Sequence, residues 1–443
     1  MDRIDRSWTA RIADALELRH FLVPRTPILS PARRRLARAL TVADLRKVAA
    51  RQVPRAVFDY TDGAADEEIS LRRTREYLRE LTFVPSSLSG LEAVDTSTTL
   101  FGAKVAQPFV LAPTGFTRMM HADGETAVVR SARRHGVAYT LSTMGTTSIE
   151  QVAAESADAP LWFQLYVSRD RETNADLLRR ARAAGYGALL VTVDVPVGGQ
   201  RLRDARHGFG YPPRLAAGTF LDGLRRPGWT ARFLTTPPLS FASLGGSTKD
   251  LGAHMAHLFD PTMTIADLQW LRQEWDGPFV VKGVQSVADA VRYAEAGVDG
   301  IILSNHGGRQ LDRSPTPVAL LPEVVDAVGS RLTVGVDSGF LSGADIAAAL
   351  ALGADFVMLG RAYLYGLMAG GELGVDRALE ILSAELVRTM KLLGVGAVDD
   401  LTPAHVRVPG TEAAARAPFR ATRPRPGEHR PGGAQARRTA SLR

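Results

Sequence analysis

The sequence predicts an α/β fold, a (β/α)8 barrel with an N-terminal helical cap and a long insert after the fourth strand. Between residues 108 and 361, eight short apolar runs alternate with stretches of helical periodicity. The runs are apolar throughout, so both faces of each strand are expected to be buried, as in a parallel sheet. Eight such βα units favour a closed barrel over an open doubly wound sheet.

The predicted strands are rich in β-branched residues. Helical stretches follow seven of them, for example at 124–135, 173–184, 286–296 and 343–352. No Gly-x-Gly-x-x-Gly motif follows a strand, so a nicotinamide site of the Rossmann type has no support. The strands are predicted at 108–113, 138–143, 161–166, 188–195, 279–284, 300–305, 332–337 and 356–361.

Four further regions surround this pattern. Residues 1–40 are an extension, and residues 41–107 predict a helical cap on one end of the barrel, which spans 108–408. Residues 196–277 are far longer than an ordinary connection between a strand and a helix, and they predict an active-site lid. Residues 411–443, rich in Arg, Pro and Gly with few large apolar side chains, predict a disordered tail.

Composition limits the function. The net charge is +7, and residues 411–443 contribute +6 of it through eight arginines and two glutamates, so no nucleic-acid partner is expected for the folded part. A weak attraction of the tail to anionic membrane or RNA stays open. The absence of cysteine excludes disulfides and Cys-ligated metal centres, and no metal site is predicted. No signal peptide or membrane span is evident, which predicts a cytoplasmic protein.

Chemically capable residues follow nearly every predicted strand. Barrel active sites lie at the carboxyl ends of the strands, so these side chains are expected to converge on one pocket. A spacing of two places Gln164 with Tyr166, Thr192 with Asp194, and Ser304 with His306 on one side of their strands. The others are Thr114, Ser142, Lys282, Asp337, Ser338, Gly360 and Arg361.

These residues lie in motifs that carry a family resemblance. SNHGGRQLD at 304–312, TVDVP at 192–196, FQLY at 163–166, VKGV at 281–284, DSG at 337–339 and GRA at 360–362 occur in order, after VFDYTDGAADE at 57–67. From about residue 40 to 408 the chain resembles the FMN-dependent L-2-hydroxy-acid dehydrogenase/oxidase family, and most of all its actinobacterial respiratory L-lactate dehydrogenases. The resemblance implies an FMN enzyme that oxidises L-lactate to pyruvate.

The resemblance also implies roles. His306 is the base, and Asp194 pairs with its imidazolium. Arg309 and Arg201 bind the substrate carboxylate. Tyr60 donates to that carboxylate and Tyr166 to the substrate hydroxyl. Lys282 stabilises the negative charge of the reduced flavin, and the other implied cofactor contacts are Pro113, Thr114, Gly115, Ser142, Gln164, Thr192, Ser304, Asp337, Ser338, Gly339, Gly360 and Arg361.

Three positions depart from the family pattern. Leu341 stands where an arginine near the phosphate and flavin is usual, so one cationic contact is missing. Met144 replaces a bulky aromatic residue of glycolate oxidase, which predicts a different side-chain pocket. Gly115 stands where oxidases usually have alanine, and this favours a dehydrogenase that reacts slowly with oxygen.

The acceptor and assembly are less constrained. A quinone or cytochrome is the expected acceptor, and oxygen with release of hydrogen peroxide is the alternative. Residues 220–234 mix Phe, Leu and Trp with Arg, which predicts either a membrane-surface segment on the inner face of the cell membrane or a segment packed on the barrel or a neighbouring subunit. The resemblance implies a homo-oligomer, a tetramer or octamer. A Schiff-base aldolase using Lys282 is the alternative from a different class, and a protein that acts through its arginine tail is another.

Overall fold

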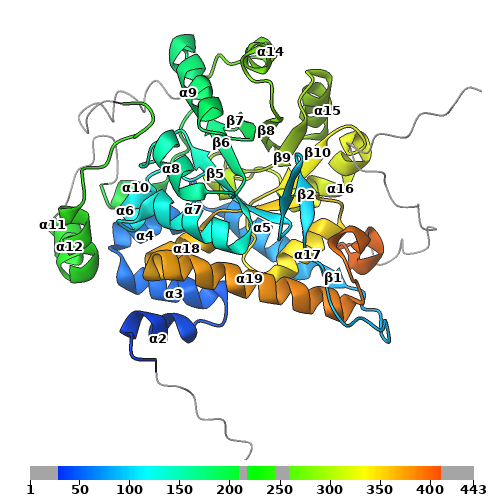
Figure 1. The fold of residues 1–443 in the computed structure, drawn as a ribbon, viewed down its shortest axis with the longest axis horizontal. Coiled ribbons are helices and arrows are strands. Elements are labelled where there is room, and N and C mark those ends of the chain that lie inside the picture. The colour runs from blue at the N-terminus through cyan, green and yellow to red at the C-terminus, as the bar shows by residue number, and fades with distance from the viewer. Residues whose placement is uncertain (1–27, 209–216, 246–258, 411–443) are drawn as a thin grey trace, which may run out of the picture.

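The computed structural model of the chain describes residues 28–208, 217–245 and 259–410 (Figure 1). At its centre, eight parallel strands form a closed barrel in the order β10-β11-β4-β5-β6-β7-β8-β9. Sequential strands are neighbours around the ring, so the predicted (β/α)8 barrel is confirmed. The strands are β4 (Phe109–Leu111), β5 (Ala138–Ser142), β6 (Leu161–Leu165), β7 (Ala188–Thr192), β8 (Phe279–Val284), β9 (Gly300–Leu303), β10 (Thr333–Val336) and β11 (Phe356–Leu359).

Seven of the eight strands are shorter than predicted. The largest differences lie at carboxyl ends, where β7 ends at Thr192 and β9 ends at Leu303. Asp194 and His306 therefore lie beyond their strands, and the prediction that each shares one side of a strand with its neighbour two residues earlier is wrong. His306 has a φ of +56°, in the left-handed region and outside the range of regular strands, and the chain leaves the sheet before it.

Helices follow all eight strands and surround the barrel (Figure 1). Helix α7, Gly124–His135, has the predicted bounds, and its C-cap Gly136 adopts the left-handed conformation that ends many helices. The barrel helices are α6 (Thr117–Met120), α7 (Gly124–His135), α8 (Ile149–Ser156), α9 (Arg171–Ala183), α14 (Ile265–Glu274), α15 (Val287–Glu295), α16 (Pro317–Val328), α17 (Gly343–Ala351), α18 (Arg361–Gly370) and α19 (Glu372–Leu393).

The N-terminal segment is helical only in its first part. Helices α2 (Pro31–Ala37), α3 (Val42–Gln52), α4 (Arg55–Asp62) and α5 (Ile69–Glu80) precede a strand β1 (Thr82–Phe83), which pairs with β12 (Val406–Arg407). The described part of the predicted helical cap then continues as a hairpin of β2 (Thr98–Leu100) and β3 (Ala103–Val105). The described residues also contain short 3-10 turns at His306–Gly308, Val398–Asp400 and Pro403–His405.

The hairpin closes the amino-terminal end of the barrel. Phe101, between β2 and β3, contacts Trp162 of β6 and Phe356 of β11 with ring centroids 5.4 and 6.3 Å apart, both edge to face. These rings belong to an apolar cluster that fills the barrel interior. Gly335 makes this packing possible, because a Cβ there would lie 2.5 Å from the Phe356 ring. The barrel is thus a packed core, and polar chemistry is left to its carboxyl end.

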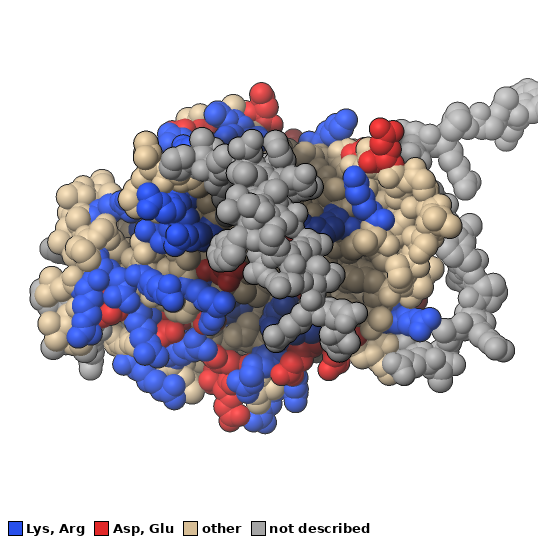
Figure 2. Space-filling view, turned by 90° about the horizontal axis from the view of Figure 1, so that it is seen from below, with Lys and Arg blue, Asp and Glu red and all other residues tan. Residues whose placement is uncertain are grey.

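The insert between β7 and β8 contributes α10 (Leu202–Arg206), α11 (Ala217–Leu224) and α12 (Pro227–Thr235) before α14. Helices α11 and α12 stand out from the barrel as a pair (Figure 1). Leu221, Leu224 and Leu234 are exposed by 55%, 55% and 76%, whereas Trp229 Nε1 donates to Met119 O at 2.9 Å and anchors α12 on the barrel. From below, Lys and Arg side chains gather toward the side on which α11 and α12 lie (Figure 2).

Among the described residues, no helix combines the length and apolar character needed to cross a membrane.

Candidate active site

His306 and Asp194 meet at the carboxyl end of the barrel. His306 Nδ1 lies 3.2 Å from Asp194 Oδ1. The Asp194 side chain is 1% exposed and that of His306 22%, so the carboxylate is buried and the imidazole is partly exposed. Burial alone would raise the pKa of Asp194, but His306 and Lys282 outweigh it and hold the pKa below its ordinary value. Asp194 is therefore an anion that holds one ring nitrogen of His306 in place.

The backbone around His306 is unusual. His306, Gly307 and Gly308 have φ values of +56°, +64° and +75°. A side chain at Gly307 would meet Arg361 Nη1 at 2.6 Å, and one at Gly308 would meet Leu71 N at 2.9 Å. Two glycines must therefore follow the histidine. Left-handed residues other than glycine are costly and gather at functional sites, where the surroundings hold them in place.

Two arginines flank Tyr60. The guanidinium carbons of Arg309 and Arg201 lie 5.0 and 5.4 Å from the centre of the Tyr60 ring. Tyr60 comes from α4 of the cap, Arg309 from the loop after β9 and Arg201 from the start of the insert. Burial and the neighbouring positive charge of Arg201 lower the pKa of Arg309 to about 10. A buried cation destabilised in this way favours an anion beside it, as a substrate carboxylate would be.

Tyr166, the second predicted substrate tyrosine, follows β6. The pKa of its hydroxyl is raised well above the ordinary value, chiefly by burial and then by the charges of Asp194 and Tyr60 nearby. The phenol therefore remains protonated at every physiological pH and is available as a donor. The structure brings all six predicted catalytic and substrate-binding residues to the same end of the barrel.

Lys282, at the end of β8, has a carboxylate beside it. Its Nζ lies 2.8 Å from Asp337 Oδ2 and donates to Ser304 Oγ at 3.0 Å. Burial alone would lower the pKa of Lys282, but Asp337 and Asp194 outweigh it and raise the pKa above its ordinary value. A Schiff-base lysine must be neutral to attack a carbonyl, so this environment opposes the aldolase alternative. A permanent ammonium group suits the stabilisation of negative charge.

Gln164 provides a test of whether the site fits FMN. Its side chain is 1% exposed, and its Oε1 accepts from Ser142 Oγ at 2.9 Å. Its Nε2 is buried and has no partner among the described residues. Buried polar atoms are seldom unpaired, so a ligand acceptor is expected there. A flavin carbonyl supplies one, and the neighbouring strand ends offer hydroxyl, ammonium and backbone N–H groups to an isoalloxazine ring and its chain.

The residues after β4 and β5 are coupled. Gly115 follows Pro113 and Thr114, and a Cβ at Gly115 would lie 2.8 Å from Met144 Cβ. The two departures from the family pattern therefore depend on each other, since alanine at 115 requires Met144 to move. Thr114 Oγ1 lies 2.6 Å from Tyr363 Oη, which fixes its hydroxyl against α18.

The predicted phosphate end contains both backbone and side-chain groups. Ser338 Oγ donates to Asp337 Oδ1 at 2.7 Å and accepts from Gly307 N at 3.0 Å. Gly360 is the N-cap of α18, and the first N–H groups of a helix are able to bind an anion. The Arg361 guanidinium, however, donates to three carbonyls, Thr61 O, Gly307 O and Gly63 O, at 2.9, 2.8 and 2.7 Å. Its side chain therefore braces loops, and its predicted contact with the cofactor would come from the backbone.

The SNHGGRQLD segment also connects three parts of the chain. Arg309 Nη1 donates to Tyr60 O and, at 3.4 Å, to Gly63 O in the cap. Gln310 Oε1 accepts from Gly199 N of the insert at 2.7 Å, and Asp312 Oδ1 accepts from Ser70 N at 2.8 Å. These roles were not predicted, because the partners are backbone atoms that no sequence motif displays.

A second unpredicted group holds Tyr60 and Arg201 in place. Asp62, at the end of α4, accepts from Arg46 Nη2 at 2.7 Å, from Arg203 Nη1 at 3.0 Å and from Tyr365 Oη at 2.9 Å. Arg203 also forms an ion pair with Glu68. Because Arg203 lies two residues after Arg201, this cluster fixes the insert to the cap at the substrate end. In the sequence, the high density of Asp and Glu in residues 59–68 is the feature from which this ion-pair cluster could have been predicted.

Comparisons with known proteins place this geometry in a family. A model of the family described as FMN-dependent dehydrogenase matches residues 49–408. A Mycobacterium tuberculosis protein provisionally named L-lactate dehydrogenase is 48% identical over 396 residues, covering 89% of this chain and 95% of that protein. L-lactate dehydrogenase of Caulobacter vibrioides is 42% identical over 365 residues, covering 80% and 94%.

Solved structures agree. The crystal structure of (S)-mandelate dehydrogenase, described as a monotopic membrane protein, superposes with a TM-score of 0.80 at 36% identity, covering 84% of this chain and 100% of that one. Mandelate oxidase gives a TM-score of 0.73 at 36% identity, covering 84% and 99%.

Proposed function

The chain belongs to the FMN-dependent dehydrogenase family, and from this we propose that it oxidises L-lactate to pyruvate. Relatives named for L-lactate are 48% and 42% identical, whereas the mandelate enzymes are 36% identical, which favours the smaller substrate. The observation that carries the proposal is the His306–Asp194 pair beside two arginines at one barrel end. A base next to a cationic clamp is the arrangement that a 2-hydroxy acid requires.

In this proposal His306 takes one of the two protons that the substrate loses, and Asp194, 3.2 Å away, stabilises the resulting imidazolium. Arg309 and Arg201 bind the carboxylate with Tyr60, and Tyr166 donates to the substrate hydroxyl. FMN, when bound, would supply the acceptor for the two electrons. Lys282 offers a fixed positive charge where that cofactor gains negative charge, and Gln164 Nε2 offers a buried donor. The remaining cofactor contacts are proposed at the strand-end residues named from the sequence.

Visible spectroscopy of the purified protein tests the reaction directly. The expected result is a flavin absorption spectrum that bleaches without oxygen on addition of L-lactate and more slowly, or not at all, with (S)-mandelate. A protein without flavin, or one that no 2-hydroxy acid bleaches, would refute the proposal. Under air, hydrogen peroxide formed at the rate of dye-linked turnover would identify an oxidase and would overturn the preference for a dehydrogenase.

We further propose that α11 and α12 contact a membrane surface on the cytoplasmic side. Support comes from exposed Leu221, Leu224 and Leu234, from arginines in the same hairpin, and from a solved relative described as a monotopic membrane protein. Replacing these three leucines by serine is expected to reduce co-sedimentation with vesicles of anionic lipid while lactate-driven bleaching is kept. Unchanged co-sedimentation would contradict the assignment.

The acceptor and the assembly stay proposals as well. A quinone or cytochrome is the proposed acceptor, and a tetramer or octamer is the proposed oligomer, which sedimentation velocity distinguishes from a monomer.

A further inference from the structure

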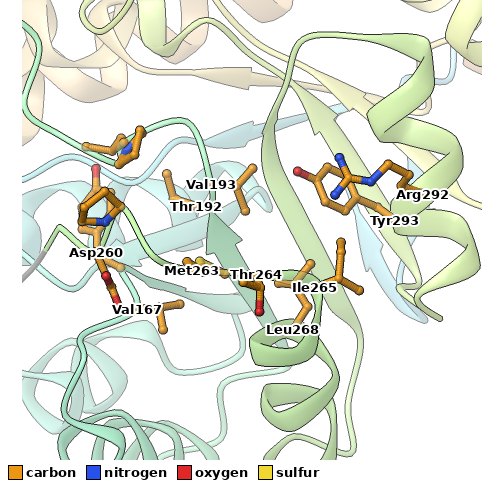
Figure 3. Close-up of a pocket in the computed structure, with 14 residues that line it drawn as sticks. Val167, Thr192, Val193, Asp260, Met263, Thr264, Ile265, Leu268, Arg292 and Tyr293 are labelled. Atoms are coloured by element: carbon orange, nitrogen blue, oxygen red, sulfur yellow. The ribbon is translucent and has the colours of Figure 1, made fainter.

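A pocket lies behind the active-site wall, where the insert rejoins the barrel. Thr192 and Val193 from the end of β7 form one side, and Tyr293 and Arg292 from α15 form another (Figure 3). Ile265, at the start of α14, lies between them (Figure 3). Further apolar lining comes from Val167, Val195, Pro196, Met263 and Leu268. Neither His306 nor Asp194, the residues predicted to be catalytic, lines this pocket.

The size of the pocket restricts its ligand. The cavity measures about 150 Å3, and an apolar cavity of about this volume holds one benzene ring. Aliphatic side chains share the lining with the polar groups of Thr192, Thr264 and Tyr293. A ring that carries carbonyl groups therefore suits this pocket better than a purely apolar molecule or an unpaired charge.

Charge at the mouth is balanced within the protein. Asp260 lies 3.1 Å from Arg169, and Arg292 lies 2.9 Å from Asp289. The charged residues that line the pocket thus already have opposite charges beside them. An anion or cation would find no unbalanced partner among the described lining residues, which favours a neutral ligand.

One lining group is suited to hydrogen-bond a carbonyl. The Tyr293 hydroxyl oxygen points from α15 toward Val193 across the pocket (Figure 3). Burial and the negative charge of Asp289 raise the pKa of Tyr293 to about 12, so its hydroxyl remains a donor at neutral pH. Among the described residues, no acceptor forms a hydrogen bond with this hydroxyl.

The pocket shares its wall with the proposed active site. Thr192 and Tyr166 line the pocket and are also proposed to contact flavin and substrate. A ring bound here would therefore lie against residues of that site, a position that serves electron transfer better than remote regulation.

From this geometry we infer that the pocket between β7, α14 and α15 binds the ring of a quinone, the electron acceptor. The inference rests on the proposed function. Oxidation of the hydroxy acid to the oxo acid releases two electrons and two protons, and reduction of a quinone to a quinol takes up two electrons and two protons, so the reaction balances without a further reactant. Tyr293 would donate to one quinone carbonyl.

Duroquinone, a single neutral ring, tests the inference on the holoenzyme. Because the chain has no cysteine, quinone addition to thiols does not interfere. Equilibrium dialysis in the absence of substrate gives the affinity for duroquinone, and steady-state rates give its KM. Ile265→Trp fills the pocket and is expected to weaken binding and raise this KM at least roughly ten-fold. Tyr293→Phe keeps the ring and is expected to raise both constants about three- to ten-fold through one lost hydrogen bond.

Lactate-driven flavin bleaching and turnover with ferricyanide should stay at wild-type rates in both variants. Leu373→Trp, at an exposed position of α19, and Tyr77→Phe on α5 are matched controls that should leave duroquinone binding unchanged. Wild-type duroquinone affinity and KM in Ile265→Trp and Tyr293→Phe would overturn the inference, as would weakened binding with an unchanged KM. If no 2-hydroxy acid bleaches the flavin, the proposed function fails, whereas dialysis still decides whether the pocket binds a ring.

Discussion

At the scale of a single residue, the site around His306 depends both on its local sequence and on contacts with distant parts of the chain. The family resemblance carried by SNHGGRQLD and TVDVP allowed the base, its partner Asp194 and the arginine three residues later to be predicted. The structure adds that the two glycines after His306 permit a left-handed turn. The backbone bonds of Arg309 and Arg361 could not be predicted. They depend on where the end of α4 lies, and the sequence does not show which backbone carbonyls lie near an arginine.

Replacing the proposed base should separate cofactor binding from chemistry. In His306→Ala, FMN is expected to remain bound, because the proposed flavin contacts are other residues. Flavin reduction by L-lactate should fall by roughly a hundred- to ten-thousand-fold, the usual contribution of a positioned acid or base. Anaerobic stopped-flow spectroscopy measures it. Reduction at a near-normal rate would refute the assignment of His306.

The clamp arginine should be sensitive even to a change that keeps its charge. Arg309→Lys loses the planar fork that grips a carboxylate in two places and also holds Tyr60 O. The KM for L-lactate is expected to rise roughly ten- to hundred-fold, in line with the loss of a charge-assisted hydrogen bond. Arg331→Lys, at an exposed position, is the control. An unchanged KM would exclude Arg309 from the carboxylate site.

At the scale of elements, the barrel strands and most of their helices were predictable from apolar periodicity. The strand ends were not, because the chain departs from the sheet where polar residues turn toward the pocket. The β2–β3 hairpin was also missed, since its few residues carry no clear alternation and gain their stability from the aromatic cluster they cover. The contact between α4 and α10, which we call the joint, is held by ion pairs such as that of Asp62 with Arg203. These partners are distant in sequence, so hydrophobic periodicity does not reveal them.

That joint gives a pH dependence with a definite sign. Burial would raise the pKa of Asp62, but the hydrogen bond and charge of Arg46 outweigh it and lower the pKa in the folded protein. Its contribution is therefore fully present above the ordinary carboxyl pKa and is lost as pH falls through the lowered value. Asp62→Asn should lower the free energy of unfolding by about 1–3 kcal/mol at neutral pH.

The difference from wild type should shrink below about pH 4, where the carboxyl pKa of an unfolded chain lies. Thermal unfolding between acid and neutral pH measures this, with exposed Asp158→Asn as the control. A destabilisation that is equal at all pH values would show that Asp62 acts through packing alone.

At the scale of the whole molecule, the two ends of the barrel have separate tasks. The amino-terminal end is closed by Phe101, Trp162 and Phe356, whereas the carboxyl end carries the polar residues. The closed barrel could be predicted by counting βα units. Which aromatic rings close its amino-terminal end could not, because that depends on the space that Gly300 and Gly335 leave for Phe101 and Phe356.

Removing one aromatic ring from the amino-terminal end should therefore lower the free energy of unfolding and leave L-lactate binding unchanged. Phe356→Ala is expected to lower the free energy of unfolding by about 3–5 kcal/mol, as for other buried phenylalanines. The KM for L-lactate at a temperature well below unfolding should remain at the wild-type value. Denaturant unfolding and steady-state rates measure both quantities. A large change in KM would mean that the two barrel ends are coupled.

The grip of Arg309 and Arg361 on the backbone of residues 60–63 has a consequence for how this enzyme can diversify. A carbonyl group is the same whichever side chain its residue carries. The carbonyls of residues 60–63 can therefore keep these bonds when a side chain in this turn of α4 changes, but Thr61 is only 3% exposed, so a replacement there must match its size. A library restricted to small residues at Thr61 and varied at the coupled pair Gly115 and Met144 would search for new hydroxy acids while these backbone hydrogen bonds are kept.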